Sequence, residues 1–464
     1  MPRKPELLLL AVLISGCSLA PQYSAPIVDL PAQYFEPGWQ SASPSDATKS
    51  IDWGLFNDTT LSDLQALLIK RNPDIHAALA HYQAATAYAA GVSGLSAPQL
   101  EAEVATLRQR QSDNRPLRGA SQPSVYNSNT LGLAGTLDLD LWGRLRNEAS
   151  MAQAQAEASA EDLREAQRSL QTQLAIHYLR LRGMDAQSKI LRETINSYGQ
   201  ALKLVESRYR GAIASELDLV RAKHQLSDAK AQLDETLGLR AVELHMVAAL
   251  VGSTAEQLKL ALPDPQPELP DIPKTLPSAL LQQRPDISAA ERRVYAANRG
   301  IGVARAAMYP DIGLTASIGG QTTGSGSLIA ASNRYWALGP LIHLPIFEGG
   351  RLQAQEDQKV AEFDEASAHY RSIVLNAIRE VEDNLAMLNH LKQQASDESD
   401  ALSAAQRATT LATQRYKEGA ISYLEVLTAQ TLDLAAQREL QKVQTNLMIH
   451  SARLIGAIGG EWGS

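Results

Sequence analysis

Histidine and cysteine are the side chains that most often bind metals or attack substrates, and this sequence uses both sparingly. It has nine His and one Cys in 464 residues, and the His residues form no HExxH or other ligand spacing. Those at His76, His369 and His390 lie in helical patterns among polar residues, where a solvated or packed His is the common role. The sequence also has no GxSxG motif and no phosphate-binding loop. It therefore predicts no catalytic centre, no cofactor and no metal site.

The single cysteine, Cys17, lies where a covalent modification is expected. Two basic residues precede an apolar stretch from Leu7 to Ile14, which is the layout of a secretory signal and is too short to span a bilayer. The tetrad Ile14-Ser15-Gly16-Cys17 resembles the bacterial lipoprotein cleavage box, in which the cysteine becomes the lipidated first residue. We therefore expect a lipid on Cys17. The alternative is that the cysteine is discarded with the leader.

Composition favours long helices over a globular enzyme. Apolar residues make up 44% of the chain, but only four are Phe and five are Trp, so large aromatic cores are scarce. The formal net charge of -8 argues against nucleic acid as a partner. Beyond the leader, no apolar run approaches the ~20 residues that a membrane helix requires. If the chain crosses a membrane, it must do so with strands.

The chain is a tandem duplication. All 21 prolines lie outside residues 124–262 and 346–464, and six of them crowd between Pro263 and Pro277, as in an extended linker. The run from Arg208 (RYRGAIASELDLVRA) matches that from Arg415 (RYKEGAISYLEVLTA) at an offset of 207 residues, and Asn72-Pro73-Asp74-Ile75 matches Arg284-Pro285-Asp286-Ile287 at an offset of 212. The expected parts are a signal peptide (1–16), a lipidated extended segment (17–59), a first repeat (60–262), the linker (263–277) and a second repeat (278–464).

Each repeat reads as helix, strand, strand, very long helix, turn and helix. The stretches 142–209 and 351–418 contain no proline, so each could be one helix of roughly 100 Å at ~1.5 Å per residue. Apolar residues in the second stretch recur at intervals of three, four or seven, which is the seam of a coiled coil. The seam consists of Val360, Phe363, Tyr370, Val374, Ile378, Val381, Leu385 and Leu388. By itself this seam favours simple helix–helix packing with no role in transport.

Alternating residues before each long helix predict strands. Leucines alternate with smaller or polar residues from Leu131 to Leu141, and apolar residues alternate from Ile312 to Ile318 and from Trp336 to Ile346. Long polar loops are expected at residues 112–129 and 319–333, as on the outside face of a membrane barrel. Four strands cannot close a barrel, but three chains with four strands each would supply twelve. The strand count therefore suggests a homotrimer.

These features together resemble the TolC-like outer-membrane efflux proteins, in particular the lipid-anchored OprM/NodT-type branch. The resemblance rests on the lipoprotein cysteine, the duplication, the glycines that precede each long helix (Gly143, Gly349 and Gly350) and the Arg-Tyr turns that end them. It implies a mainly α fold in which a trimeric 12-stranded membrane barrel continues into a long α-helical barrel with an equatorial belt. It also implies the cell outer membrane, extension into the periplasm, and a passive exit duct that works with a periplasmic adaptor and an inner-membrane transporter.

In this family the turn after each long helix closes the duct through tyrosine, carboxylate and arginine contacts. Alignment of the Arg208-Tyr209 and Arg415-Tyr416 turns gives Asp218 the place of the first gating carboxylate, Tyr416 that of the gating tyrosine and Glu425 that of a ring carboxylate. The sequence departs from the family pattern at two places. Ile421 replaces a gating arginine and Thr428 replaces a second ring carboxylate, so Arg208, Arg210, Arg415 and Lys417 are the cations left to complete the network. The alternative role for each of these residues is that of a solvated charge at a turn.

Two other classes of protein stay open at this point. A periplasmic adaptor also has a lipid anchor and a helical hairpin, but it would have one hairpin between lipoyl-like and barrel segments rather than two beside strand pairs. A structural coiled-coil lipoprotein would not need the strands. The exported substrate cannot be inferred from residues, so antibiotics, solvents, metals and peptides all stay open, although seven Met and one Cys argue against a dedicated copper or silver exporter.

Overall fold

The computed structural model describes residues 18–28, 35–36, 53–112, 114, 123–258, 260, 269–270, 284–324 and 326–458. The described residues divide into two compact units. The first contains those of Met1–Ile27, His81–Ala160 and Ala289–Arg371, and the second those of Val28–Ala80, Glu161–Ser288 and Ser372–Ser464. The expected signal peptide, Cys17 and all of the linker except residues 269–270 lie outside the described residues.

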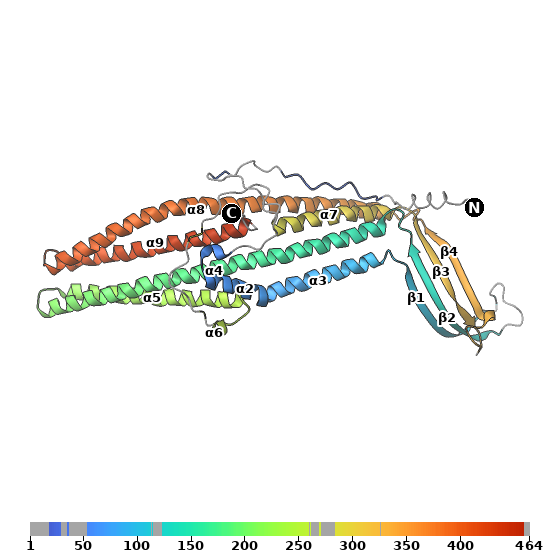
Figure 1. Cartoon of the computed structure of the whole chain (residues 1–464), viewed down its shortest axis with the longest axis horizontal. Coiled ribbons are helices and arrows are strands. Elements are labelled where there is room, and N and C mark those ends of the chain that lie inside the picture. Colours follow the sequence, from blue (N-terminus) through green and yellow to red (C-terminus); the bar gives the residue numbers. More distant parts are fainter. Residues whose placement is uncertain are drawn as a thin grey trace. The chain divides into compact units, whose positions relative to one another are not determined.

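The order of elements predicted from the duplication is confirmed (Figure 1). The first repeat contains α2 (Thr59–Arg71), α3 (Pro73–Gly94), β1 (Gln99–Arg110), β2 (Val125–Asp138), α4 (Arg144–Arg210) and α5 (Glu216–Leu250). The second contains α7 (Pro285–Ala306), β3 (Asp311–Thr322), β4 (Arg334–His343), α8 (Arg351–Lys417) and α9 (Tyr423–Ile458). Short helices η1 (Trp53–Phe56), α6 (Ala255–Leu258) and η3 (Ala331–Asn333) lie between them. The fold is mainly helical with one small sheet.

The two long helices match their predicted bounds closely. Each has 67 residues, α4 beginning at Arg144 and α8 at Arg351. Glycines precede both, and Gly143 (φ 75°) and Gly350 (φ 83°) adopt the left-handed conformation that lets a strand segment turn into a helix. Within the described part of the chain, no helix combines the length and apolar character that a membrane crossing requires.

The four strands form one antiparallel sheet in the order β1-β2-β3-β4, so the middle contact joins the two repeats. The strands extend into segments that the sequence predicted as loops: β2 begins at Val125, inside 112–129, and β3 continues to Thr322, inside 319–333. The polar start of β2 is nevertheless a strand because it pairs with β1, as at Asn129 and Thr106. Cross-strand pairing outweighs the low strand propensity of Asn and Ser. The loop bounds predicted from composition were therefore wrong.

One face of the sheet is apolar and exposed. Residues paired across strands point to the same face, and Leu133, Ile318 and Trp336 are successive partners that are 56%, 62% and 77% exposed. The same face continues through Leu100, Val104, Leu131, Leu314, Leu338 and Ile342. The other face carries small and polar residues, including the row Gln99, Thr136, Thr315 and Gly339. The two faces are therefore suited to different surroundings.

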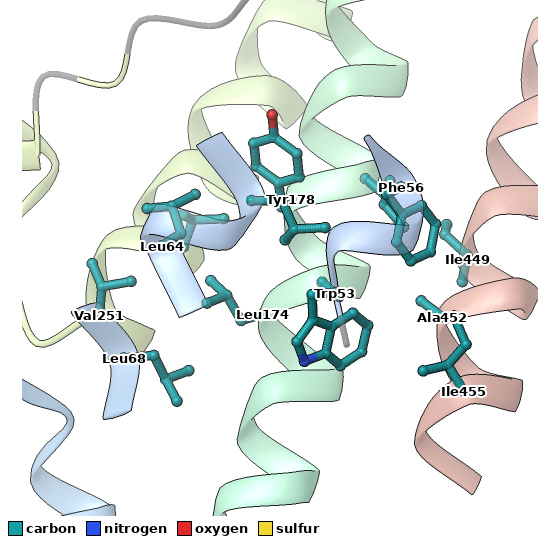
Figure 2. Close-up of a cluster of buried hydrophobic side chains, with 14 of the residues drawn as sticks. Trp53, Phe56, Leu64, Leu68, Leu174, Tyr178, Val251, Ile449, Ala452 and Ile455 are labelled. Carbon is teal, nitrogen blue, oxygen red and sulfur yellow. The ribbon is translucent and has the colours of Figure 1, made fainter. Parts of the chain in front are cut away.

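The core of the second unit is built around the short helices η1 and α2. Figure 2 shows Trp53 and Phe56 of η1 between Leu174 of α4 and Ile449 and Ala452 of α9. Residues of α2 and α5 complete this cluster, which is almost fully buried. The segment 17–59, expected to be extended, thus contains a helical turn at residues 53–56 because its two aromatic side chains are buried there. This turn joins helices that belong to different repeats.

A second cluster confirms part of the predicted seam. Val374, Ile378, Val381, Leu385 and Leu388 are buried. The last three of these pack against α9 residues that include Val443, Leu447 and Leu454. Val360, at the start of the predicted seam, is 38% exposed. The C-terminal part of the predicted seam in α8 therefore packs against α9.

Candidate functional site

The candidate site consists of the turns that end the two long helices. The first turn joins α4 to α5, and the second joins α8 to α9 (Figure 1). In the first turn the amide of Ile213 donates to the carbonyl of Arg208 (2.8 Å) and the amide of Ala212 to that of Tyr209 (3.0 Å). These two bonds close a helix C-terminus and require a left-handed residue, which here is Ala212 with φ 58°.

The second turn repeats this geometry 207 residues later. The amide of Ala420 donates to the carbonyl of Arg415 (2.9 Å) and the amide of Gly419 to that of Tyr416 (3.0 Å). Gly419 adopts φ 79°, so the left-handed position is filled by glycine here and by alanine in the first turn. The duplication predicted from sequence therefore extends to individual hydrogen bonds at the turns.

Asp218 closes the start of α5. Its backbone amide donates to Ser215 Oγ (3.1 Å), and its carboxylate accepts from the same hydroxyl (2.8 Å) and from the Ser215 amide (3.4 Å). This is a capping box, which satisfies amides that a helix start leaves unpaired. Arg221 lies 3.9 Å from the carboxylate. The carboxylate predicted for the gate thus also holds the turn in shape.

Tyr416 is buried beneath an arginine of the other repeat. The Cζ of Arg208 lies 4.5 Å from the centre of the Tyr416 ring, within the range of a cation–π interaction. Its Nη1 and Nη2 donate to the carbonyls of Tyr416 and Lys417, both at 2.7 Å. Arg208 therefore pairs with the last carbonyls of α8, where a positive charge is favoured by the helix dipole. Of the four cations proposed from sequence, Arg208 is the one that contacts Tyr416.

Tyr423 supports Tyr416 from behind. The two rings lie 5.6 Å apart at an angle of 61°. The Tyr423 hydroxyl donates to Gln225 Oε1 (3.3 Å), and Gln225 Nε2 donates to Gln430 Oε1 (3.3 Å). Burial, followed by the nearby Tyr416, raises the pKa of Tyr423 to about 12, so its hydroxyl stays protonated and can donate. The Tyr198 hydroxyl adds a bond to the Gln430 carbonyl (3.1 Å).

The sequence did not identify Tyr423, Gln225 or Gln430. They are buried polar residues whose partners lie about 200 positions away, and helical periodicity does not distinguish them from ordinary core positions. A comparison of the repeats could have identified Tyr423, because the two turn sequences are similar but differ at this position, where the first repeat has Glu216.

The other predicted site residues lie on the surface of the turns. Glu425, Arg415 and Tyr209 are exposed, and no hydrogen bond or ion pair joins the Glu425 side chain to another described residue. Ile421, which replaces a family arginine, packs against the cluster around Tyr416. The Thr428 hydroxyl donates to its own helix at the Leu424 carbonyl (2.9 Å). Glu425 is therefore a carboxylate that can meet solvent or ions.

A groove of about 790 Å³ lies beside Tyr416, lined by residues of α4, α8 and α9 that include Leu204, Thr413 and Gln430. Beside this groove, Arg208 and the cluster around Tyr416 join α4 to α8 at the turns.

Among the described residues, including those of the turns, no group of three or more His, Cys, Asp or Glu side chains is arranged to hold a metal ion.

Comparisons with known proteins match almost the whole chain. The model of the outer membrane efflux protein family matches residues 64–253 and 276–460. The toluene efflux pump outer membrane protein TtgF of Pseudomonas putida is 33% identical over 98% of this chain and 96% of that protein. The cation efflux system protein CusC of Escherichia coli is 30% identical over 97% of each. The crystal structure of a membrane protein from Pseudomonas aeruginosa is 30% identical, with a TM-score of 0.87 over 96% of this chain and 100% of that one.

Proposed function

The chain belongs to the outer membrane efflux protein family, and on that premise we propose that it works as a homotrimeric exit duct. As a member of this family it is an outer-membrane channel of an efflux pump, a transport duct rather than an enzyme. The observation that carries the proposal of a trimer is the sheet. Among the described strands, β1 and β4 each pair on one side only, and hydrocarbon does not tolerate open edges because their backbone groups lack partners.

Three copies would remove these edges. In the meander β1-β2-β3-β4, β4 of one copy runs antiparallel to β1 of the next, so three chains close a 12-stranded barrel. The exposed apolar face, with Trp336 and Leu338, would then face lipid, and the row with Thr136 and Thr315 would face the lumen. The long helices would continue the barrel toward the periplasm, with the core around Trp53 as the equatorial belt.

The trimer is tested by native mass spectrometry of detergent-extracted protein. We expect three chains in the intact particle. A stable monomer that remains inserted in membranes would contradict the proposal, because it would have to expose unpaired strand edges to lipid.

The N-terminal contacts support a lipid on Cys17. Ser18, one residue later, donates through Oγ to Asn147 Oδ1 (3.1 Å) in the first turns of α4, and the Tyr23 hydroxyl donates to Glu291 of α7. Residues after Cys17 are thus bound to the unit that carries the sheet, which suits a lipid that enters the same membrane. The variant Cys17→Ala should lose palmitate labelling, and label retained at another residue would contradict the assignment.

The partners proposed for the duct are a periplasmic adaptor and an inner-membrane transporter. Two relatives of similar identity are named for toluene and for cations, so we propose that the transporter selects the cargo and that the duct passes what it receives. The protein should restore efflux in a strain without its own outer-membrane channel only when a matching adaptor and transporter are present. Efflux without them would contradict this arrangement.

We also propose that Glu425 forms the cation-selective constriction of the duct. Threefold symmetry brings three copies of an axial residue together, and three close carboxylates attract cations, multivalent ones most strongly. Glu425 is exposed and has no side-chain partner among the described residues, whereas Asp218 is bound in its capping box. Tyr416, Tyr209, Arg208 and Arg415 would shape the closed turns around it.

Planar-bilayer conductance tests the constriction. The variant Glu425→Ala should lose cation selectivity and become less sensitive to block by a trivalent cation added on the periplasmic side. Asp218→Asn is the matched control, because an amide oxygen can still accept from Ser215 and preserve the cap. If selectivity persists in Glu425→Ala and is lost in Asp218→Asn, the first repeat provides the constriction instead.

A further inference from the structure

The contacts at the turns are completed for only one of the two repeats within a chain. Arg208 stacks on Tyr416 and pairs with the last carbonyls of α8. The residues 207 positions away, Arg415 and Tyr209, are exposed, and Tyr209 keeps 41% of its surface. No described side chain or carbonyl pairs with the Arg415 guanidinium. The same donor and the same acceptor are thus present a second time, but on surfaces that do not meet each other.

The apolar residues beside this contact show the same asymmetry. Leu204 of α4 and Leu427 of α9 pack against the cluster around Tyr416. Their counterparts at an offset of 207, Leu411 of α8 and Val220 of α5, are 51% and 55% exposed. Arg415 and Leu411 therefore form one uncovered half-surface on the second repeat, and Tyr209 and Val220 form the complementary one on the first.

We propose that these half-surfaces bind each other between neighbouring copies of the chain. In a closed ring each first repeat has a second repeat on both sides, one from its own chain and one from the adjacent copy, so the contact surfaces alternate head to tail. Arg415 of one copy would then stack on Tyr209 of the next and donate to the carbonyls of Tyr209 and Arg210. The Tyr209 carbonyl accepts from the Ala212 amide, as the Tyr416 carbonyl accepts from Gly419, and a second lone pair remains for the guanidinium.

The contact between copies would be weaker than the contact within a chain. Tyr423, which supports Tyr416, corresponds to the exposed Glu216. Gln225 and Gln430, which bond to each other across the repeats, correspond to Leu432 and Lys223, which cannot form that bond. The turns of neighbouring copies should therefore separate before the two turns of one chain do.

This inference rests on the proposed homotrimer, and cysteine cross-linking tests it separately. In the variant Leu411→Cys/Val220→Cys, a short bismaleimide should convert most of the monomer band on denaturing gels into dimers and trimers. The matched control is Leu204→Cys/Leu427→Cys, which should give only a monomer with one internal cross-link, identified by mass. The parent protein controls for reaction at Cys17.

The outcomes separate the two proposals. If native mass spectrometry shows a trimer but the Leu411→Cys/Val220→Cys variant gives no cross-link between chains, the contact is wrong and the trimer stands. If no trimer exists, both proposals fail. Adding Arg415→Ala to the same variant should reduce the yield of cross-linked trimer more than adding Arg415→Lys, and an undiminished yield in both would show that Arg415 does not hold the contact.

Discussion

The two repeats cap the C-terminal ends of α5 and α9 in the same way but with different residues. In the first repeat, Asn72 Nδ2 donates to the carbonyl of Leu250 at the end of α5 (2.8 Å). In the second, Arg284 Nη1 donates to the carbonyl of Ala457 near the end of α9 (2.9 Å). The two acceptors are 207 residues apart, and both donor residues are 2% exposed. In each repeat, the residue just before the proline that begins a helix (α3 or α7) thus binds the C-terminal end of the repeat's last long helix (α5 or α9).

A second pair of contacts within the hairpins shows the same retention. His177 Nδ1 lies 2.7 Å from Glu243 Oε2 in the first repeat, and His450 Nδ1 lies 2.9 Å from Asn384 Oδ1 in the second. His177 and Asn384 occupy matching positions 207 residues apart, as do Glu243 and His450. The histidine of the pair therefore lies in α4 in the first repeat and in α9 in the second. The contact site is kept, but the oxygen that faces the histidine belongs to a glutamate in the first repeat and to an asparagine in the second.

The turns differ from these two sites. Tyr416 is buried under Arg208, whereas Tyr209 and Arg415 are exposed. The two contacts compared at the base and in the middle of each hairpin lie inside one repeat, so each chain forms both copies of them. The contact of Arg208 with Tyr416 instead joins the two repeats, and among the described residues it is formed once. We therefore interpret the exposed Tyr209 and Arg415 as a surface that binds another repeat, and not as a contact that was lost when the two repeats diverged.

The largest effect is expected at the base of the second hairpin. Arg284 donates to Asp286 (3.0 and 2.7 Å), to Glu380 (2.9 Å) and to the Ala457 carbonyl. The variant Arg284→Ala leaves these acceptors without their cation and should cost about 3–5 kcal/mol. The matched variant Asn72→Ala removes neutral bonds only and should cost about 1–3 kcal/mol. Guanidinium unfolding at one protein concentration measures both losses.

Equal losses in the two variants would break the comparison at this point. They would show that the second repeat gains nothing from its buried charge beyond a helix cap. The variant Arg284→Asn sharpens the result, because it gives the second repeat the residue type of the first but leaves Glu380 without a donor.

A smaller effect is expected at the left-handed positions of the turns. Ala212 adopts φ 58° and Gly419 adopts φ 79°, and an added Cβ at Gly419 would meet no atom within 4 Å. Backbone strain alone therefore separates the two residues. Ala212→Gly should stabilise the protein and Gly419→Ala should destabilise it, each by about 1 kcal/mol. Opposite shifts in the unfolding midpoint are expected, and shifts of the same sign would contradict the equivalence of the turns.

Local signals in the sequence were enough to predict the duplication and the long helices. Proline-free stretches and apolar periodicity depend on neighbouring residues, and α8 begins at the predicted Arg351 and ends one residue before the predicted bound. The start of β2 at Val125 was missed because its polar residues form a strand only through pairing with β1. Composition alone could not reveal that pairing.

The candidate site was predictable in position but not in contacts. The matched Arg-Tyr turns located both turns, and Ser215 three residues before Asp218 is the signature of the capping box that the structure contains. The stacking of Arg208 on Tyr416 could not be chosen among four cations, because it depends on how α4 and α8 approach each other. The roles of Glu425 and Cys17 stay predictions that the proposed experiments test.

The smallest effect concerns the histidine that changed helices. Burial, followed by the nearby Arg453, lowers the pKa of His450, so the folded protein favours the neutral ring that faces Asn384 Oδ1 through Nδ1. The unfolded chain has a His pKa of about 6.5, and as the pH falls through this value the unfolded state binds the extra proton. The stability that comes from neutral His450 is thus present above about pH 6.5 and is lost toward acid.

The variant His450→Gln should therefore reduce the fall in melting temperature between about pH 7.5 and pH 5, since its side chain does not titrate in this window. The control is His369→Gln, which removes a histidine of α8 whose side chain is 73% exposed. Its acid slope should match that of the parent protein. If the slope is unchanged in His450→Gln, protonation of His450 does not affect stability. The second repeat would then differ from the first in the helix that carries the histidine but not in its sensitivity to acid.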